Sequence, residues 1–205
     1  NVYNGGTTGT ATVFMEEPSS FAVADKWFAV GNNLPGALWM DGGLFAMTNG
    51  TFYVGDKEGY VRLNGGKISL RAESQSTLVV GNGAAYGSMH VSGGELATRK
   101  SAYPSETYVE IGPEKSTAAE FYMDAGKVSL ANERFLLGRS KTAGSTATLT
   151  LDGTADFNVG IFVMGRSTAG IKTTLNLNGG SFSSSKGLST YGQTGPTRQI
   201  NLNGG

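Results

Sequence analysis

The sequence predicts an all-β fold, a right-handed parallel β-helix (β-solenoid) of about seven turns with three strands in each turn. Three observations lead to this prediction: a recurring six-residue stretch, a second recurring mark that ends in glycine, and the lack of any 3.6-residue apolar period. The clearest copy of the stretch is Leu-Asn-Leu-Asn-Gly-Gly at residues 175–180, and it returns at residues 200–205. Parallel crossovers are almost always right-handed, so we expect a right-handed coil.

The six-residue stretch alternates inward and outward positions and then turns. Asn or Asp before the glycine pair tolerates the positive φ of a tight turn. Further copies stand at residues 38–43, 61–66 and 89–94, and degraded copies at 121–126 and 149–154. One predicted inward row comprises Leu38, Val61, Met89, Phe121, Leu149, Leu175 and Ile200. The second comprises Met40, Leu63, Val91, Met123, Leu151, Leu177 and Leu202.

A second mark consists of an alternating apolar pair followed by glycine, as in Phe52-Tyr53-Val54-Gly55. In the last copy the mark is expected at Tyr191-Gly192, with Ser189 replacing the first apolar residue. A third apolar pair, such as Phe45 and Met47, lies between the two marks. Each turn is therefore predicted to contain three short strands, and each inward row stacks at the ~4.8 Å spacing of neighbouring strands.

The repeats run through the chain without a linker, which predicts a single β-solenoid domain over residues 1–205. Residues 1–43 form the longest unit, and its extra length is expected to be a surface loop around residues 16–20. A shortened copy of the stretch opens the chain, and no capping segment is visible at either end. Uncapped ends would join head to tail through Val2, Tyr3, Ile200 and Leu202, or the stack would continue in a longer chain.

The composition limits the kinds of partner that the chain is expected to bind. The chain has 32 Gly, no Cys, and 16 Lys and Arg against 16 Asp and Glu. A formal net charge of zero argues against nucleic acid, which requires a basic surface. No apolar run reaches transmembrane length, so we expect no membrane insertion.

The recurring Leu-x-Leu-Asn-Gly-Gly and Phe-x-Val-Gly marks resemble the repeats of known secreted proteins. The pattern resembles the passenger regions of bacterial autotransporters, and still more the glycine-rich β-strand repeats of very large secreted surface proteins. The resemblance covers the whole chain. It implies an extracellular or cell-surface location, in bacteria, and a role in display, adhesion or spacing.

The outward residue of the six-residue stretch forms the first candidate site. It comprises Val2, Trp39, Arg62, His90, Tyr122, Thr150, Asn176 and Asn201. Trp39, Arg62, His90 and Tyr122, here called the outward stripe, are predicted to lie on consecutive turns. Aromatic and basic side chains in such a row suit contact with a sugar or a partner. The alternative is an exterior ladder of mutually packed side chains.

Two further rows leave alternatives open. The outward residues of the second mark, from Ala29 through Glu110 to Thr190, form a face more apolar than a free surface needs, so it is either an interface or covered by loops. Asp124 and Asp152 occupy adjacent turns, where they would share a cation or make two separate Asx turns. Because the second reading is favoured, we assign no metal ligand and no cofactor.

The sequence favours a non-enzymatic structural protein of an extracellular filament, sheath or adhesin stalk. The alternative is a β-helical carbohydrate-binding or carbohydrate-degrading protein acting on a polysaccharide. Degradation would require clustered carboxylates on neighbouring turns, and the acidic residues are scattered. No nucleophile, base and orienting group can be named around His90, the single histidine. Ice binding would require a regular threonine row, and the threonines are too local.

Overall fold

The computed structural model describes residues 10–24, 27–71, 76–83, 86–98, 108–112, 115, 117–167 and 169–204, without the side chains of residues 76, 131 and 132. Every element assigned in these residues is a β-strand, and every strand pairing is parallel. The predicted β-solenoid is therefore confirmed. None of the described segments is a helix long and apolar enough to cross a membrane.

The strands line three sides of the solenoid. The first side contains β1 (Ala11–Met15), β4 (Gly36–Met40), β7 (Gly59–Leu63), the start of β10 (Tyr86–Thr98), the start of β12 (Ala118–Leu137), β13 (Thr146–Leu151), β15 (Lys172–Leu177) and β18 (Thr197–Leu202). The second side contains β2 (Ser20–Val23), β5 (Leu44–Met47), β8 (Lys67–Leu70), the end of β10, the middle of β12, the start of β14 (Asp156–Met164) and β16 (Ser181–Ser184). The third side contains β3 (Phe28–Val30), β6 (Phe52–Val54), β9 (Ser76–Val80), β11 (Tyr108–Ile111), the ends of β12 and β14, and β17 (Leu188–Ser189).

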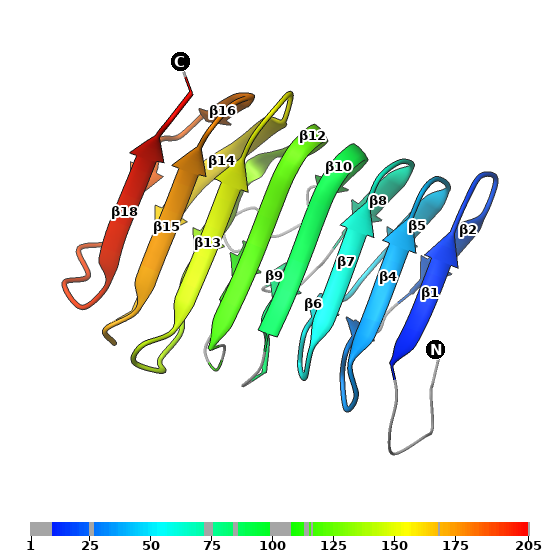
Figure 1. Cartoon of the computed structure of the whole chain (residues 1–205), viewed down its shortest axis with the longest axis horizontal. Coiled ribbons are helices and arrows are strands. Elements are labelled where there is room, and N and C mark those ends of the chain that lie inside the picture. Colours follow the sequence, from blue (N-terminus) through cyan, green and yellow to red (C-terminus); the bar gives the residue numbers. More distant parts are fainter. Residues whose placement is uncertain are drawn as a thin grey trace.

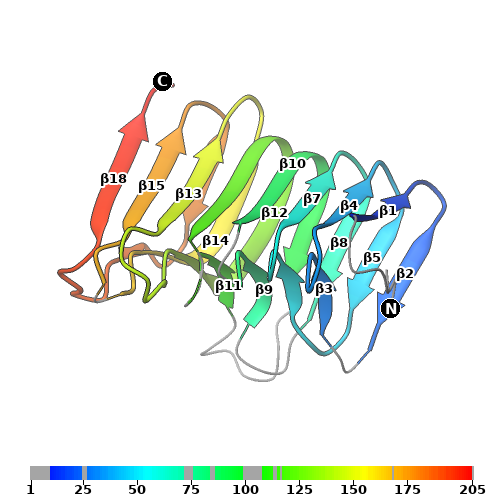
Figure 2. The same ribbon diagram turned by 60° about the horizontal axis from the view of Figure 1, so that its bottom comes forward.

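The coil is right-handed, as the crossover rule predicts. Figure 1 shows the first-side strands in front, running upward, with the chain passing behind them at the top while the turns advance to the left. A path that climbs in front, descends behind and advances to the left is right-handed. The strands of the described residues group into about seven turns, with β1 and β18 at opposite ends of the stack. Figure 2 shows β3, β9 and β11 along the third side.

The two inward rows of the first side have the predicted register. Leu38 pairs with Val61, Val61 with Met89, and the pairing continues to Ile200. From Leu38 to Leu175 the members of this row are at most 2% exposed. Full burial of each such side chain contributes roughly 1.5–3 kcal/mol. Stacking of consecutive turns therefore supplies the core that a single turn lacks.

Phenylalanines fill the core toward both ends of the stack. Phe45 and Phe52 lie in one group, with ring centroids 5.0 Å apart. In the other group, Phe135 and Phe162 are neighbours in register on the third side, and their rings stack at 5.6 Å. Ring pairs at this separation contribute about 0.5–1.5 kcal/mol beyond their buried area. The core is thus tied from turn to turn by side chains as well as by backbone hydrogen bonds.

The first 43 residues contain one more turn than the sequence pattern indicates. The sequence analysis treated residues 1–43 as one long unit. In the structure β1 is a separate strand of the first side, and it pairs with β4, so that Val13 lies beside Leu38 and Met15 beside Met40. The expected loop at residues 16–20 is a short corner leading into β2. Its corner lacks the Asn-Gly-Gly mark. There the Glu17 carboxylate accepts a hydrogen bond from the Gly43 backbone N–H of the next turn at 2.9 Å.

The last turn differs from the expected register by one residue. Leu188, not Ser189, pairs with Phe162, and Ser189 pairs with Val163. The outward residue of this turn is therefore Ser189 and not Thr190. Continuing the register by two residues places Tyr191 beside Gly165, at the corner that ends the third side.

Candidate contact surfaces

The outward stripe lies on the first side, and its predicted order is confirmed. Trp39 pairs with Arg62, Arg62 with His90, and His90 with Tyr122, on consecutive turns. Strand alternation places all four side chains outside, because their neighbours in sequence are inward residues. Val2, the first predicted member, lies outside the described residues. The position beside Trp39 belongs to Phe14.

The stripe contains two aromatic pairs separated by Arg62. Phe14 and Trp39 meet edge to face with centroids 5.1 Å apart, and they are 63% and 43% exposed. His90 and Tyr122 meet in the same way at 4.8 Å. Arg62 donates from Nε to Asn64 Oδ1 at 2.7 Å. These side chains touch one another, as the packed-ladder interpretation requires, and still present exposed rings. A contact with a sugar or partner stays a prediction.

Negative charge lies beside His90 and Tyr122, at one end of the stripe. His90 Nε2 is 3.4 Å from Asp124 Oδ1, close enough for an ion pair when the imidazole is protonated. Burial, followed by the charges of Asp152 and Asp124, raises the pKa of the Tyr122 hydroxyl. Tyr122 therefore stays a neutral hydrogen-bond donor at physiological pH.

A third aromatic pair extends the first side, and the sequence analysis missed it. Tyr60 and Tyr86 have ring centroids 5.7 Å apart, and the Tyr86 hydroxyl donates to Glu120 Oε2 at 2.6 Å. Burial and this carboxylate raise the pKa of Tyr86 to about 12. Tyr60 and Glu120 stand two residues before Arg62 and Tyr122, so strand alternation could have placed them on the same side.

The Asp124 and Asp152 carboxylates act separately. Asp152 Oδ1 accepts the N–H of the next residue, Gly153, at 2.7 Å, so a backbone N–H satisfies this carboxylate, although the Asx turn proper would use the N–H two residues on. Asp124 is directed toward His90 instead. No group of three or more His, Cys, Asp or Glu side chains in the described part of the chain could hold a metal ion.

The apolar face of the third side is covered in its central part. Tyr108, Leu136 and Val163 form a small cluster and are 7%, 1% and 0% exposed, with Ile161 packed against it. The Tyr108 ring reaches over the next two turns, and its hydroxyl accepts hydrogen bonds from Arg134 Nη1 at 2.8 Å and Arg166 Nη1 at 3.5 Å. These residues are therefore covered rather than open, and the described cover is the Tyr108 side chain of β11. The inserted loops that the sequence analysis expected as cover lie outside the described residues.

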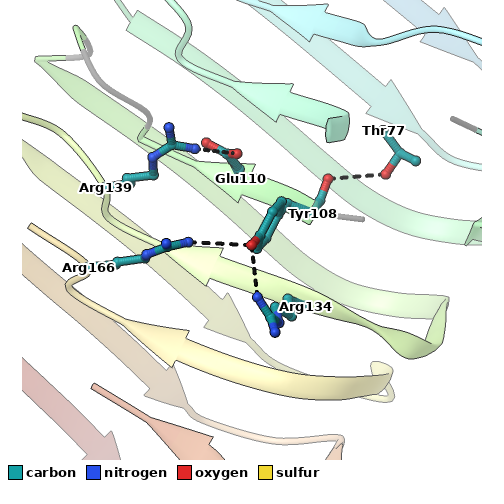
Figure 3. Close-up of polar contacts among 6 residues, drawn as sticks. All are labelled: Thr77, Tyr108, Glu110, Arg134, Arg139 and Arg166. Atoms are coloured by element: carbon teal, nitrogen blue, oxygen red, sulfur yellow. Dashed lines mark hydrogen bonds and ion pairs between the residues drawn. The ribbon is translucent and has the colours of Figure 1, made fainter. Parts of the chain in front are cut away.

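Figure 3 shows the polar side chains around Tyr108 on the third side. The Arg134 and Arg166 guanidinium carbons lie 5.5 Å and 5.9 Å from the Tyr108 ring centroid. Beside them, Arg139 Nη1 forms an ion pair with Glu110 Oε1 at 2.9 Å, and Glu110 is 3% exposed. Both Arg139 and Arg166 follow a corner glycine in a Gly-Arg-Ser triplet. The corner repeat thus places guanidinium groups at the rim of the third side.

The end of the stack exposes two of the predicted interface residues. Ile200 and Leu202 are 47% and 73% exposed, although their partners in β15 continue the inward rows. Val2 and Tyr3, the other two, lie outside the described residues. Arg198 supports this end, since Nε and Nη2 donate to the Met164 and Gly165 carbonyl oxygens at 2.8 Å and 2.9 Å.

The fold and these surfaces define the class as a parallel β-solenoid with aromatic and basic side chains on its outer sides. Comparison with protein-family models, curated proteins and solved structures gives no match.

Proposed function

We propose that this chain is a non-enzymatic structural solenoid of an extracellular filament, sheath or adhesin stalk. Its turns stack end to end, either between chains or with further turns of a longer chain. The carrying observation is the continuous parallel stack, in which the turns on either side bury the inward row from Leu38 to Leu175. The resemblance to glycine-rich secreted repeats supports the extracellular assignment.

The residues exposed on β18 belong to rows that are buried in the interior of the stack. Ile200 is 47% exposed, whereas Leu175 and Leu149 in the two preceding turns are 2% and 0% exposed. Leu202 is 73% exposed, whereas Leu151 is fully buried. Another turn on β18 would bury both side chains, at roughly 1.5–3 kcal/mol each, and would pair the backbone edge.

Concentration-dependent assembly tests this proposal. The purified 205-residue chain is expected to form fibres one solenoid wide that lengthen with concentration in negative-stain micrographs. Leu202→Asp should prevent assembly, because it places a charge on the joining surface. Leu44→Asp is the matched control, since Leu44 is 41% exposed on the second side and should not affect fibre length. A monomer at every concentration would contradict joining between chains.

A carbohydrate-binding role is the second candidate, and the exposed rings of the first side favour it. Phe14, Trp39, Tyr60 and Tyr86 present aromatic groups from four successive turns, and Tyr122 adds one from the next turn. Rings of this kind bind sugars by stacking, and Arg62 lies among them.

The double variant Trp39→Ser and Tyr122→Ser is expected to weaken glycan binding about tenfold while the unfolding midpoint changes little. The expected loss corresponds to about 0.5–1 kcal/mol for each ring contact. Calorimetric titration with neutral oligosaccharides measures it, and Asn176→Ser, in the same outward row but at the other end, is the control. If the parent binds no glycan at millimolar concentration, the second candidate is wrong.

A further inference from the structure

Tyr191 occupies a backbone position that belongs to glycine in every earlier turn. The corner after the third-side strand is Gly31, Gly55, Gly81, Gly112, Gly138 and Gly165, with φ between 63° and 81°. The register of β17 places Tyr191 at the same corner, and its φ is 50°. It is the one non-glycine residue with positive φ among those described. An L-residue is strained in this conformation, so the tyrosine lowers the stability of this corner.

The strained corner presents an aromatic ring beside a guanidinium group. Tyr191 is 40% exposed, and the Arg166 guanidinium carbon lies 5.0 Å from its ring centroid. The same guanidinium group also approaches the buried Tyr108 hydroxyl. Arg166 thus lies between two tyrosines, the buried Tyr108 and the partly exposed Tyr191.

Arg134 brings a second guanidinium group to the same place. It donates to the Tyr108 hydroxyl oxygen that Arg166 also approaches, so the two positive groups converge on one atom. No carboxylate of the described residues lies within ion-pair distance of either, in contrast to Arg139 with Glu110. Glu133, next to Arg134 in sequence, is 5% exposed and belongs to the interior. Two neighbouring cations with no counter-charge among the described residues form a site for an anion.

We propose that Arg134, Arg166 and Tyr191 bind a carboxylated sugar unit of an acidic polysaccharide. The planar guanidinium groups match a planar carboxylate through paired hydrogen bonds. The exposed Tyr191 ring offers a flat, amphipathic surface on which a pyranose ring stacks. The site lies on the third side and reaches its last turn, where Tyr191 follows β17. None of its three side chains belongs to the joining residues Ile200 and Leu202 of β18, so it does not depend on head-to-tail joining. A filament of such chains would repeat the site and bind a long acidic polymer by avidity.

Titration with a galacturonate hexamer tests the site on the full chain, by calorimetry at low and high salt. We expect saturable binding that weakens with salt, no binding of a galactose hexamer, and at least tenfold weaker binding after Arg134→Gln with Arg166→Gln. Arg166→Lys should also weaken binding, because it keeps the charge and loses the planar group. Lys172→Gln, an exposed cation on the first side, should have no effect.

Tyr191 provides the sharpest test, because binding and stability are expected to change in opposite directions. Tyr191→Gly should raise the unfolding midpoint by relieving the strained corner, and it should weaken galacturonate binding at least tenfold. Tyr191→Phe should keep the affinity. The proposal is overturned if Tyr191→Gly retains full binding or lowers the midpoint. It is also overturned if the galactose hexamer or a polyglutamate peptide binds as tightly as the galacturonate hexamer.

Discussion

Alanine in place of Gly31 is expected to lower the free energy of unfolding by about 4 kcal/mol or more, a loss typical of severe backbone disruption. Gly31 has φ 76°, and a Cβ there would lie 2.0 Å from the Glu58 carbonyl oxygen of the next turn. The two turns would have to separate, which breaks the hydrogen bond from the Lys57 N–H to the Gly31 carbonyl oxygen, 2.7 Å long. Strain from positive φ alone accounts for only about 1–2 kcal/mol.

Gly144→Ala is the matched control for this substitution. Gly144 has φ 81°, and an added Cβ would meet nothing within 4 Å. We therefore expect a loss of only about 1–2 kcal/mol, from the backbone conformation alone. Urea unfolding followed by fluorescence measures both variants, because Trp27 and Trp39, the two tryptophans of the chain, flank Gly31. Equal losses at the two positions would show that contact with the next turn does not matter.

Glu133 is expected to make the folded chain less stable as the pH rises. Its side chain is 5% exposed, and neither carboxyl oxygen makes a hydrogen bond of normal geometry with a described residue. Burial raises its pKa from 4.5 to about 7, opposed only in part by the Thr98 side chain. Between these values the unfolded chain has released the proton and the folded chain has kept it. Stability from this group therefore falls across that range by about 3 kcal/mol and is constant above it.

Glu133→Gln should remove this loss, because an amide stays neutral at every pH. Urea unfolding at pH 8 is expected to show the variant more stable than the parent by about 2–3 kcal/mol, whereas at pH 4 the two should agree within about 1 kcal/mol. Glu58→Gln is the control, since Glu58 is exposed. A pH-independent difference between parent and Glu133→Gln would contradict the role of ionisation.

The solenoid and its rows were predictable because they depend on local sequence. Alternation within one strand decides which residues point inward, and the Asn-Gly-Gly and Val-Gly corners end the strands. Where these marks are intact, as from Leu38 to Leu175, the predicted register and the order of the outward stripe are confirmed. Where they are absent, the prediction is wrong. The turn containing β1 ends in a corner closed by the Glu17 carboxylate, and nothing in the local pattern marks it.

Contacts that cross several turns could be found only in the tertiary structure. Tyr108 covers the third side by reaching the Arg166 guanidinium, 58 residues away in the chain. The burial of Glu133 likewise depends on what surrounds it and not on its neighbours in sequence. The sequence pattern assigned Tyr191 as an inward apolar residue. The pairing of Leu188 with Phe162 instead places it at the strained corner. The alternation of a strand is set by its own backbone geometry. Which residues a long side chain reaches on other turns depends instead on the packing of the whole stack.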